Sequence, residues 1–115
     1  KSSHNIWMSE KNVGFIKLRF TTNANRWLRQ IQDYHTDRGN PKKGRRIARQ
    51  ILDRAKELED FPELGPEEES LKDLGKGHRS LLVGTLYKII YLLAAPLIII
   101  TDIFDTRQDT DKIKP

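Results

Sequence analysis

Apolar residues recur along this chain with two different spacings, and each spacing predicts a different kind of element. Residues 13–20 alternate apolar and polar side chains, as in a strand with one buried face. From residue 24 onward, apolar residues recur every three or four positions, which predicts a helix of about three turns. Thr21 or Thr22 supplies the hydroxyl of its N-cap. We expect the whole apolar stripe of this helix to pack in the core, its aromatic members included: Ala24, Trp27, Leu28, Ile31 and Tyr34.

A second helix is predicted from about residue 43 to residue 61. The helix-breaking run at residues 38–41 separates it from the first helix. Pro62 ends it, because the residue before a proline is pushed out of the helical conformation. Two helices joined by a short loop pack antiparallel, so we expect a helical hairpin with a shared apolar face. In the second helix that face consists of Ile47, Ala48, Ile51, Leu52, Ala55 and Leu58.

Three strands are predicted in the last third of the chain, at residues 78–83, 86–93 and 97–104, with turn signals between them. The last two are almost continuously apolar, so the helices should cover at least one of their faces. The element order β-α-α-β-β-β predicts an α+β fold: a twisted, mainly antiparallel sheet of about four strands with an α-helical hairpin packed on one face. We expect residues 13–113 to form this single domain. Residues 1–12 would be an N-terminal extension, either natural or added in cloning.

Two polar segments complete the chain. Residues 63–77 contain a Gly-Pro turn and three consecutive glutamates, and within residues 63–73 Leu64 and Leu71 are the only sizeable apolar anchors. We therefore expect this connection to be mobile and poorly packed. The tail, residues 105–115, should begin ordered and then fray, so that deleting its last five residues should cost little stability.

Composition narrows the class of protein. A chain of 115 residues with 37% hydrophobic and 32% charged residues fits one globular domain. It contains no cysteine, which excludes disulfides and cysteine-based metal or redox chemistry and makes a cytoplasmic setting the default expectation. The longest apolar run, residues 89–100, is interrupted by Pro96 and is shorter than the roughly 20 residues that span a bilayer. We therefore read it as buried strands and expect no membrane association.

Charge is distributed unevenly along the chain, although the net charge is only +5. Residues 42–56 hold seven basic residues and one acid, residues 57–73 hold eight acids and one basic residue, and residues 74–101 hold no acid. Two interpretations remain open. The chain has a basic ligand-facing surface beside a separate acidic loop, or its helix faces and loops are charged only for solubility.

Five side chains of the predicted sheet are candidates for binding an anionic partner: Arg79, Tyr87, Lys88, Tyr91 and Arg107. Arg79 opens one strand, Lys88 lies within the next, and Arg107 follows the last. If these strands are neighbours, the three charges would converge near one concave surface. The alternative is that each long side chain merely reaches solvent at a sheet edge.

Several common kinds of site lack their sequence signatures. The three histidines, His4, His35 and His78, are scattered, and no carboxylate stands at ligand spacing from them, so we expect no metal site. The glycines at positions 75 and 77 lack the spacing of a phosphate-binding loop. We therefore expect neither a metal nor a cofactor.

The element order and several short motifs resemble the RelE/ParE family of bacterial toxins, the toxin halves of type II toxin–antitoxin pairs. The motifs are Thr21-Thr22 opening the first helix, residues 58–62 ending the second, Gly77-x-Arg79 entering the sheet, YKIIY at residues 87–91 and FDTRQ at residues 104–108. The resemblance covers about residues 13–113. It implies a growth-inhibiting toxin that is neutralised by a cognate antitoxin. We expect that partner to be a partly disordered, acidic-amphipathic segment lying along the helical hairpin and across the sheet near Arg79 and Lys88.

The family implies two possible targets. RelE-like members cleave mRNA on the ribosome, using basic residues and a tyrosine to orient and charge-stabilise attack by a ribose 2′-hydroxyl. ParE-like members inhibit DNA gyrase and lack that basic set. By resemblance, Arg79, Lys88 and Arg107 stand at three of the basic positions of the nucleases. His78 is the only residue that would restore a general acid or base.

Departures from the nuclease pattern favour the gyrase inhibitor. Leu81 and Val83 stand where the nucleases carry further basic residues, and Ile113 stands where a tyrosine is expected. Without those groups a nuclease would have less charge to place on the developing phosphorane. We therefore predict a ParE-like inhibitor of DNA gyrase. The alternatives are a RelE-like ribosome-dependent mRNA endoribonuclease and a non-toxic nucleic-acid-binding domain of the same fold.

Overall fold

The computed structural model describes residues 17–115, and its elements follow the predicted order β-α-α-β-β-β. Two short 3₁₀ helices, η1 and η2, are added to that order. The part of the first strand predicted before Lys17, the N-terminal extension and His4 lie outside the described residues. The elements are β1 (Lys17–Phe20), α2 (Thr22–Asp37), α3 (Pro41–Asp60), η1 (Glu69–Leu74), β2 (Arg79–Val83), β3 (Tyr87–Ala94), β4 (Leu97–Asp105) and η2 (Thr110–Lys112).

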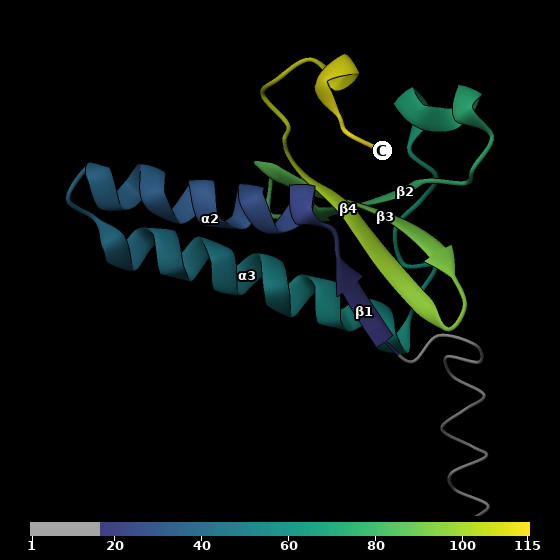
Figure 1. Cartoon of the computed structure of the whole chain (residues 1–115), viewed down its shortest axis with the longest axis horizontal. Coiled ribbons are helices and arrows are strands. Elements are labelled where there is room, and N and C mark those ends of the chain that lie inside the picture. The colour runs from purple at the N-terminus through teal and green to yellow at the C-terminus, as the bar shows by residue number, and fades with distance from the viewer. Residues whose placement is uncertain (1–16) are drawn as a thin grey trace, which may run out of the picture.

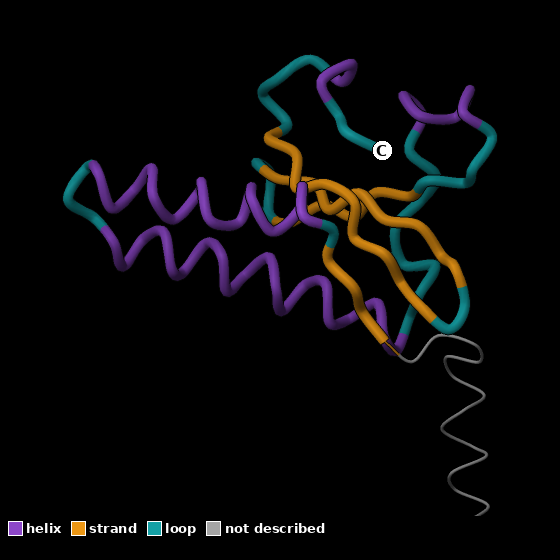
Figure 2. The backbone as a smooth tube through the Cα atoms, viewed as in Figure 1, coloured by secondary structure: helices purple, strands orange, loops and turns teal. Residues whose placement is uncertain are grey.

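The four strands form one sheet in the order β1-β4-β3-β2. β1 runs parallel to β4, whereas the β2–β3 and β3–β4 pairs are antiparallel. The predicted sheet of mainly antiparallel strands is thus confirmed. α2 and α3 form an antiparallel hairpin on one face, and the hairpin projects well past the end of the sheet (Figures 1 and 2).

Caps and a close approach between helices define the hairpin. The Thr21 hydroxyl accepts a hydrogen bond from the Ala24 amide (3.2 Å), so Thr21 is the N-cap of α2. The Asn40 side chain caps α3 by accepting from the Lys43 amide (3.3 Å). Gly44 lets the helices pack closely, because a Cβ there would lie 3.0 Å from the Cα of Gln32. None of the helices that the structure describes is long and apolar enough to cross a membrane.

The main core lies between the hairpin and the sheet. Its helix side includes Ile51, Ala55 and Leu58 of α3. Its sheet side includes Leu81, Ile89 and Ile103, which lie side by side on β2, β3 and β4. The prediction that Trp27 packs against this core is confirmed. The same prediction for Tyr34 is wrong: Tyr34 is 52% exposed. Tyr34 lies near the end of α2 and lines the groove between the hairpin and the sheet instead of the core.

A second, smaller core covers the opposite face of the sheet. It is formed by Leu71 of η1, Ile90 of β3, Phe104 of β4 and Ile113 of the tail. Two segments that are distant in sequence, the connection after α3 and the chain terminus, thus fold over one sheet face (Figure 1). Both had been expected to be loose.

The expectation of a poorly packed connection is therefore wrong for its middle part. Glu68 is only 4% exposed, and Leu71 is buried beside it. Leu64, the other expected anchor, is instead exposed. Apolar periodicity did not predict this packing because Leu71 is an isolated apolar residue and the other contact is the ion pair of Glu68 with Lys88.

The tail is likewise anchored near its end. Ile113 is 5% exposed, and the amide of the next residue, Lys114, donates to the buried carboxylate of Asp102 (2.8 Å). The expected fraying after Arg107 is not observed. One apolar side chain and one buried acceptor hold the chain after η2 against the sheet.

Candidate binding groove between the hairpin and the sheet

Strand register separates the basic residues that had been expected to converge. Arg79 of β2 pairs with Tyr91 of β3. Three residues further along β2, Leu82 pairs with Lys88. Because side chains alternate between the faces of a strand, Lys88 lies on the face opposite to Tyr87 and Tyr91. The expected convergence of Arg79, Lys88 and Arg107 on one surface is therefore wrong. The signal was present in the sequence, since Lys88 directly follows one tyrosine of this strand and is three residues from the other.

Arg79 and Tyr91 hold the connection after α3 against the sheet. The buried Tyr91 hydroxyl accepts from the Gly65 amide (2.9 Å) and donates to the Pro62 carbonyl (2.9 Å). The Arg79 guanidinium donates to the carbonyls of Gly65 (2.6 Å) and Glu63 (3.2 Å). Burial raises the pKa of Tyr91 and keeps its phenol protonated. The Tyr91 hydroxyl and two of the three guanidinium nitrogens of Arg79 are thus engaged within the molecule.

Lys88 is engaged on the other face. Its ammonium lies 2.9 Å from a carboxylate oxygen of Glu68. Burial alone would raise the pKa of Glu68, but hydrogen bonds from Ser70, Lys88 and Ser80 outweigh it and lower that pKa to about 2. This pair is a partly buried ion pair on the second face of the sheet, with Glu68 buried and Lys88 of intermediate exposure. It is not a free cation facing a ligand.

His78 is also withdrawn from solvent. It is 2% exposed, and neither ring nitrogen has a hydrogen-bond partner in the part of the chain that the structure describes. Burial, with a smaller contribution from Lys76, lowers the pKa of His78, so the imidazole is neutral near pH 7. His78 does not line the groove described next. Its suggested role as a general acid or base has no geometric support.

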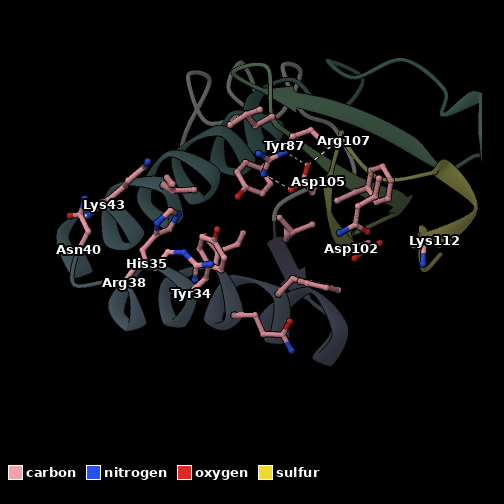
Figure 3. Close-up of a pocket in the computed structure, with 18 residues that line it drawn as sticks. Tyr34, His35, Arg38, Asn40, Lys43, Tyr87, Asp102, Asp105, Arg107 and Lys112 are labelled. Carbon is pink, nitrogen blue, oxygen red and sulfur yellow. Dashed lines mark hydrogen bonds and ion pairs between the residues drawn. The ribbon is translucent and has the colours of Figure 1, made fainter.

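Two of the predicted residues, Tyr87 and Arg107, do meet at one site. They line a groove of about 620 Å³ between the outer half of α2, the start of α3 and the end of β4 (Figure 3). Its apolar lining comes from the helices and from β4, chiefly Trp27, Ile31, Ile47, Ile103 and Phe104. Its polar lining is mostly aromatic and cationic and includes Tyr34, Arg38, Lys43, Tyr87, Arg107 and Lys112.

The sheet side of the groove holds a bidentate ion pair. The Arg107 guanidinium donates to both carboxylate oxygens of Asp105 (3.0 and 2.7 Å), while the Arg107 side chain remains 65% exposed (Figure 3). These hydrogen bonds lower the pKa of Asp105 below its usual range. Burial, and then the Asp105 charge, raise the pKa of Tyr87. Tyr87 therefore offers the groove a protonated phenol.

The helix side holds an aromatic–cationic cluster that sequence reasoning missed. The guanidinium of Arg38 lies 3.9 Å from the ring centroid of Tyr34, and the His35 ring meets the same tyrosine edge-on at 5.0 Å. Desolvation, Lys43 and Arg38 lower the pKa of His35, in that order. The available signal was the spacing of Tyr34 and Arg38, four residues apart at the end of a helix. This spacing was overlooked because Tyr34 also fits the apolar stripe of α2.

The groove has the composition of a surface that receives a peptide segment. An apolar floor offers burial, while the tyrosines and cations of the rim offer hydrogen bonds and positive charge. Among the described residues, no group of three histidine, aspartate or glutamate side chains is placed to hold a metal ion.

The fold is similar to that of a solved chain from a toxin–antitoxin system. The match is to a chain of the "Chromosomal ParDE TA system from P. aeruginosa", with a TM-score of 0.65 and 20% sequence identity, and it covers 78% of this chain and 95% of that chain. The sequence pattern of the family described as "ParE toxin of type II toxin-antitoxin system, parDE" matches residues 18–110. The chain therefore belongs to the ParE toxin family, as the sequence motifs had indicated. No curated protein matches it.

Proposed function

We propose that this chain is a growth-inhibiting toxin whose target is DNA gyrase, and that a cognate antitoxin neutralises it. The observation that carries the gyrase proposal is the separation of the basic side chains that an mRNA-cleaving relative would gather at one site. Lys88 is paired with Glu68 on one face of the sheet, and Arg79 is bonded to backbone carbonyls on the other. Of these three side chains, only Arg107 lines the groove. Separated in this way, Arg79, Lys88 and Arg107 cannot act together on the charge of a developing phosphorane.

Two further residues support the same proposal. Ile113, at the position where a nuclease would carry a tyrosine, is a core residue of the second sheet face. His78 is buried and does not line the groove. Neither residue therefore supplies the groove with the tyrosine or the general base that a nuclease would use.

The groove supports the antitoxin part of the proposal. A partly disordered, acidic-amphipathic segment would bury its apolar side chains against Trp27, Ile31 and Ile47 and place its carboxylates near Arg38 and Lys43. The matched chain of known structure belongs to a ParDE toxin–antitoxin system, which agrees with such a partner.

The experiment that tests the target combines induction of the chain in bacteria with an assay of purified gyrase. Growth should stop, translation should continue at first, and the purified chain should lower the rate of supercoiling by purified gyrase. Arg107→Ala, which alters an exposed groove residue without disturbing the core, should produce no change in mRNA integrity, because no cleavage occurs in the parent. New mRNA ends mapped by primer extension soon after induction, with supercoiling unaffected, would establish the RelE-like alternative instead. Unimpaired growth at confirmed expression would reject the toxin proposal altogether.

A further inference from the structure

A row of cations follows the outer side of the first half of α3. It consists of Lys42, Arg45, Arg46 and Arg49, which we call the basic stripe. Spacings of three, four and seven residues place all four on one side of a helix. The residues of α3 that are buried in this half, Gly44, Ala48 and Ile51, lie on the opposite side. All four stripe residues are exposed.

The charge of the stripe is not balanced within the chain. Between residues 38 and 52 there are six basic residues and no acidic one. Of the ion pairs that the described residues form, none includes a stripe residue. The acids of α3 lie in its other half, at Asp53, Glu57, Glu59 and Asp60. A helix face charged only for solubility would be expected to mix the two signs.

The position of the stripe concentrates this charge at the projecting end of the molecule. α3 begins at the tip of the hairpin, which lies beyond the sheet and away from the other described elements (Figure 1). The N-terminal end of a helix also carries a partial positive charge from its backbone dipoles. Like charges at these spacings repel one another and destabilise the isolated helix. The arrangement is therefore favourable only against an anionic partner.

We propose that the basic stripe binds the phosphate backbone of duplex DNA. A phosphate backbone is recognised by charge alone, and the stripe offers charge without the aromatic platforms that single strands stack on. The stripe spans seven residues, or about 10 Å along the helix, over which a DNA duplex presents about one charge per 1.7 Å, so each cation can reach its own phosphate. The major groove of B-DNA is wide enough to admit a helix, whereas that of A-form RNA is deep and narrow.

The binding surface differs from the groove between hairpin and sheet, which is lined by Lys43 and Ile47 of the same helix and by none of the stripe residues. The inference therefore does not depend on gyrase being the target. It adds to the molecule a second surface, one that would hold it on DNA while the groove remains available to a protein.

The test measures fluorescence anisotropy of a labelled DNA duplex of about 20 base pairs, roughly two helical turns, titrated with the whole chain at several salt concentrations. Four phosphate contacts predict that affinity falls about 150-fold between roughly 50 and 200 mM salt. The triple variant Arg45→Gln, Arg46→Gln, Arg49→Gln retains one contact. Its affinity should be much weaker at low salt and should fall only about fourfold over the same range.

Two matched variants separate the stripe from general effects. The triple variant Lys17→Gln, Arg19→Gln, Lys76→Gln removes three exposed cations elsewhere and reaches the same net charge, and it should keep the parental affinity and salt slope. Replacing the three arginines of the stripe by lysine should also keep the salt slope. Unchanged thermal melts in all variants would show that the fold is retained.

Four results would overturn the proposal. The first is no binding of DNA at low salt, and the second is an equal loss of affinity in the control triple variant. The third is tighter binding of an RNA duplex of the same sequence than of DNA. The fourth is a stripe variant that binds DNA as the parent does but loses affinity for the antitoxin, which would assign the stripe to a protein partner.

Discussion

Tyr91 shows how one hydroxyl can position a segment that has little apolar anchorage of its own. It bonds the Gly65 amide and the Pro62 carbonyl at the same time. Gly65 itself admits no side chain, because a Cβ there would lie 2.2 Å from the Ser80 carbonyl oxygen. The connection after α3 is thus fixed to the sheet by backbone contact before it reaches η1.

Tyr91→Phe should lower the free energy of unfolding by about 1–3 kcal/mol, because the buried Gly65 amide then loses its acceptor. Urea denaturation at neutral pH measures the change. Tyr34→Phe is the matched control, since its ring is exposed and its hydroxyl makes no buried bond. We expect that control to lie within about 0.5 kcal/mol of the parent. Equal stabilities of the two variants would refute the anchoring role.

Glu68 makes the stability of the chain depend on pH. The folded-state pKa of about 2 lies below the ordinary value of 4.5. A depressed carboxyl pKa contributes stability that is fully present above pH 4.5 and is lost as the pH falls toward 2. The contribution would be about 3 kcal/mol.

Asp102, whose pKa is raised chiefly by burial, titrates with the opposite sign. Stability should therefore be measured from pH 6 down to about pH 2 for both the parent and Glu68→Gln, so that the Asp102 contribution cancels in the difference. The parent's advantage should shrink over this interval. A difference that does not change with pH would contradict the proposed role of the Glu68–Lys88 pair.

At the scale of elements, the sequence predicted where helices and strands occur but not everything that covers them. Periodicity identified α2, α3 and the last three strands, because each has a continuous apolar side. It also grouped Tyr34 with the core, since periodicity cannot distinguish an aromatic side chain that lines an open groove from one that is buried. The second core was missed because Leu71 and Ile113 are isolated apolar residues in polar segments. Their burial depends on contacts between segments far apart in the chain.

The C-terminal tail, residues 105–115, allows a prediction about the stability of the fold at the scale of elements. Deleting residues 111–115 removes Ile113 from the second core and the Lys114 amide from the buried carboxylate of Asp102. We now expect a loss of about 2–4 kcal/mol in unfolding free energy, in place of the small effect that the sequence alone indicated. Thermal or urea melts would measure it. Removing Pro115 alone should have no effect, because it is exposed and takes part in neither contact.

At the scale of the molecule, three surfaces have different composition and different positions. The second sheet face is closed by η1 and the tail, the groove lies between hairpin and sheet, and the basic stripe lies on the outer side of α3. Of the candidates drawn from sequence, the groove retained Tyr87 and Arg107 but neither Lys88 nor Arg79. Alternation along β3 fixes the position of Lys88, whereas no local pattern indicates that Arg79 is bonded to a segment some fifteen residues earlier.

The groove and the rest of the surface should therefore differ in their response to charge reversal. Arg38→Glu with Lys43→Glu places two acids on the rim, where an acidic antitoxin segment would meet repulsion in place of attraction. We expect its affinity for the antitoxin to fall at least about tenfold, mainly through slower association, with a weaker dependence on salt. Lys72→Glu with Lys76→Glu is the control, since it makes the same change in net charge at exposed positions outside the groove. Titration calorimetry measures both affinities, and rescue of growth by co-expressed antitoxin provides the readout in cells. If the two double variants bind the antitoxin equally well, the antitoxin does not occupy the rim formed by Arg38 and Lys43, and its path must lie on another face of the toxin.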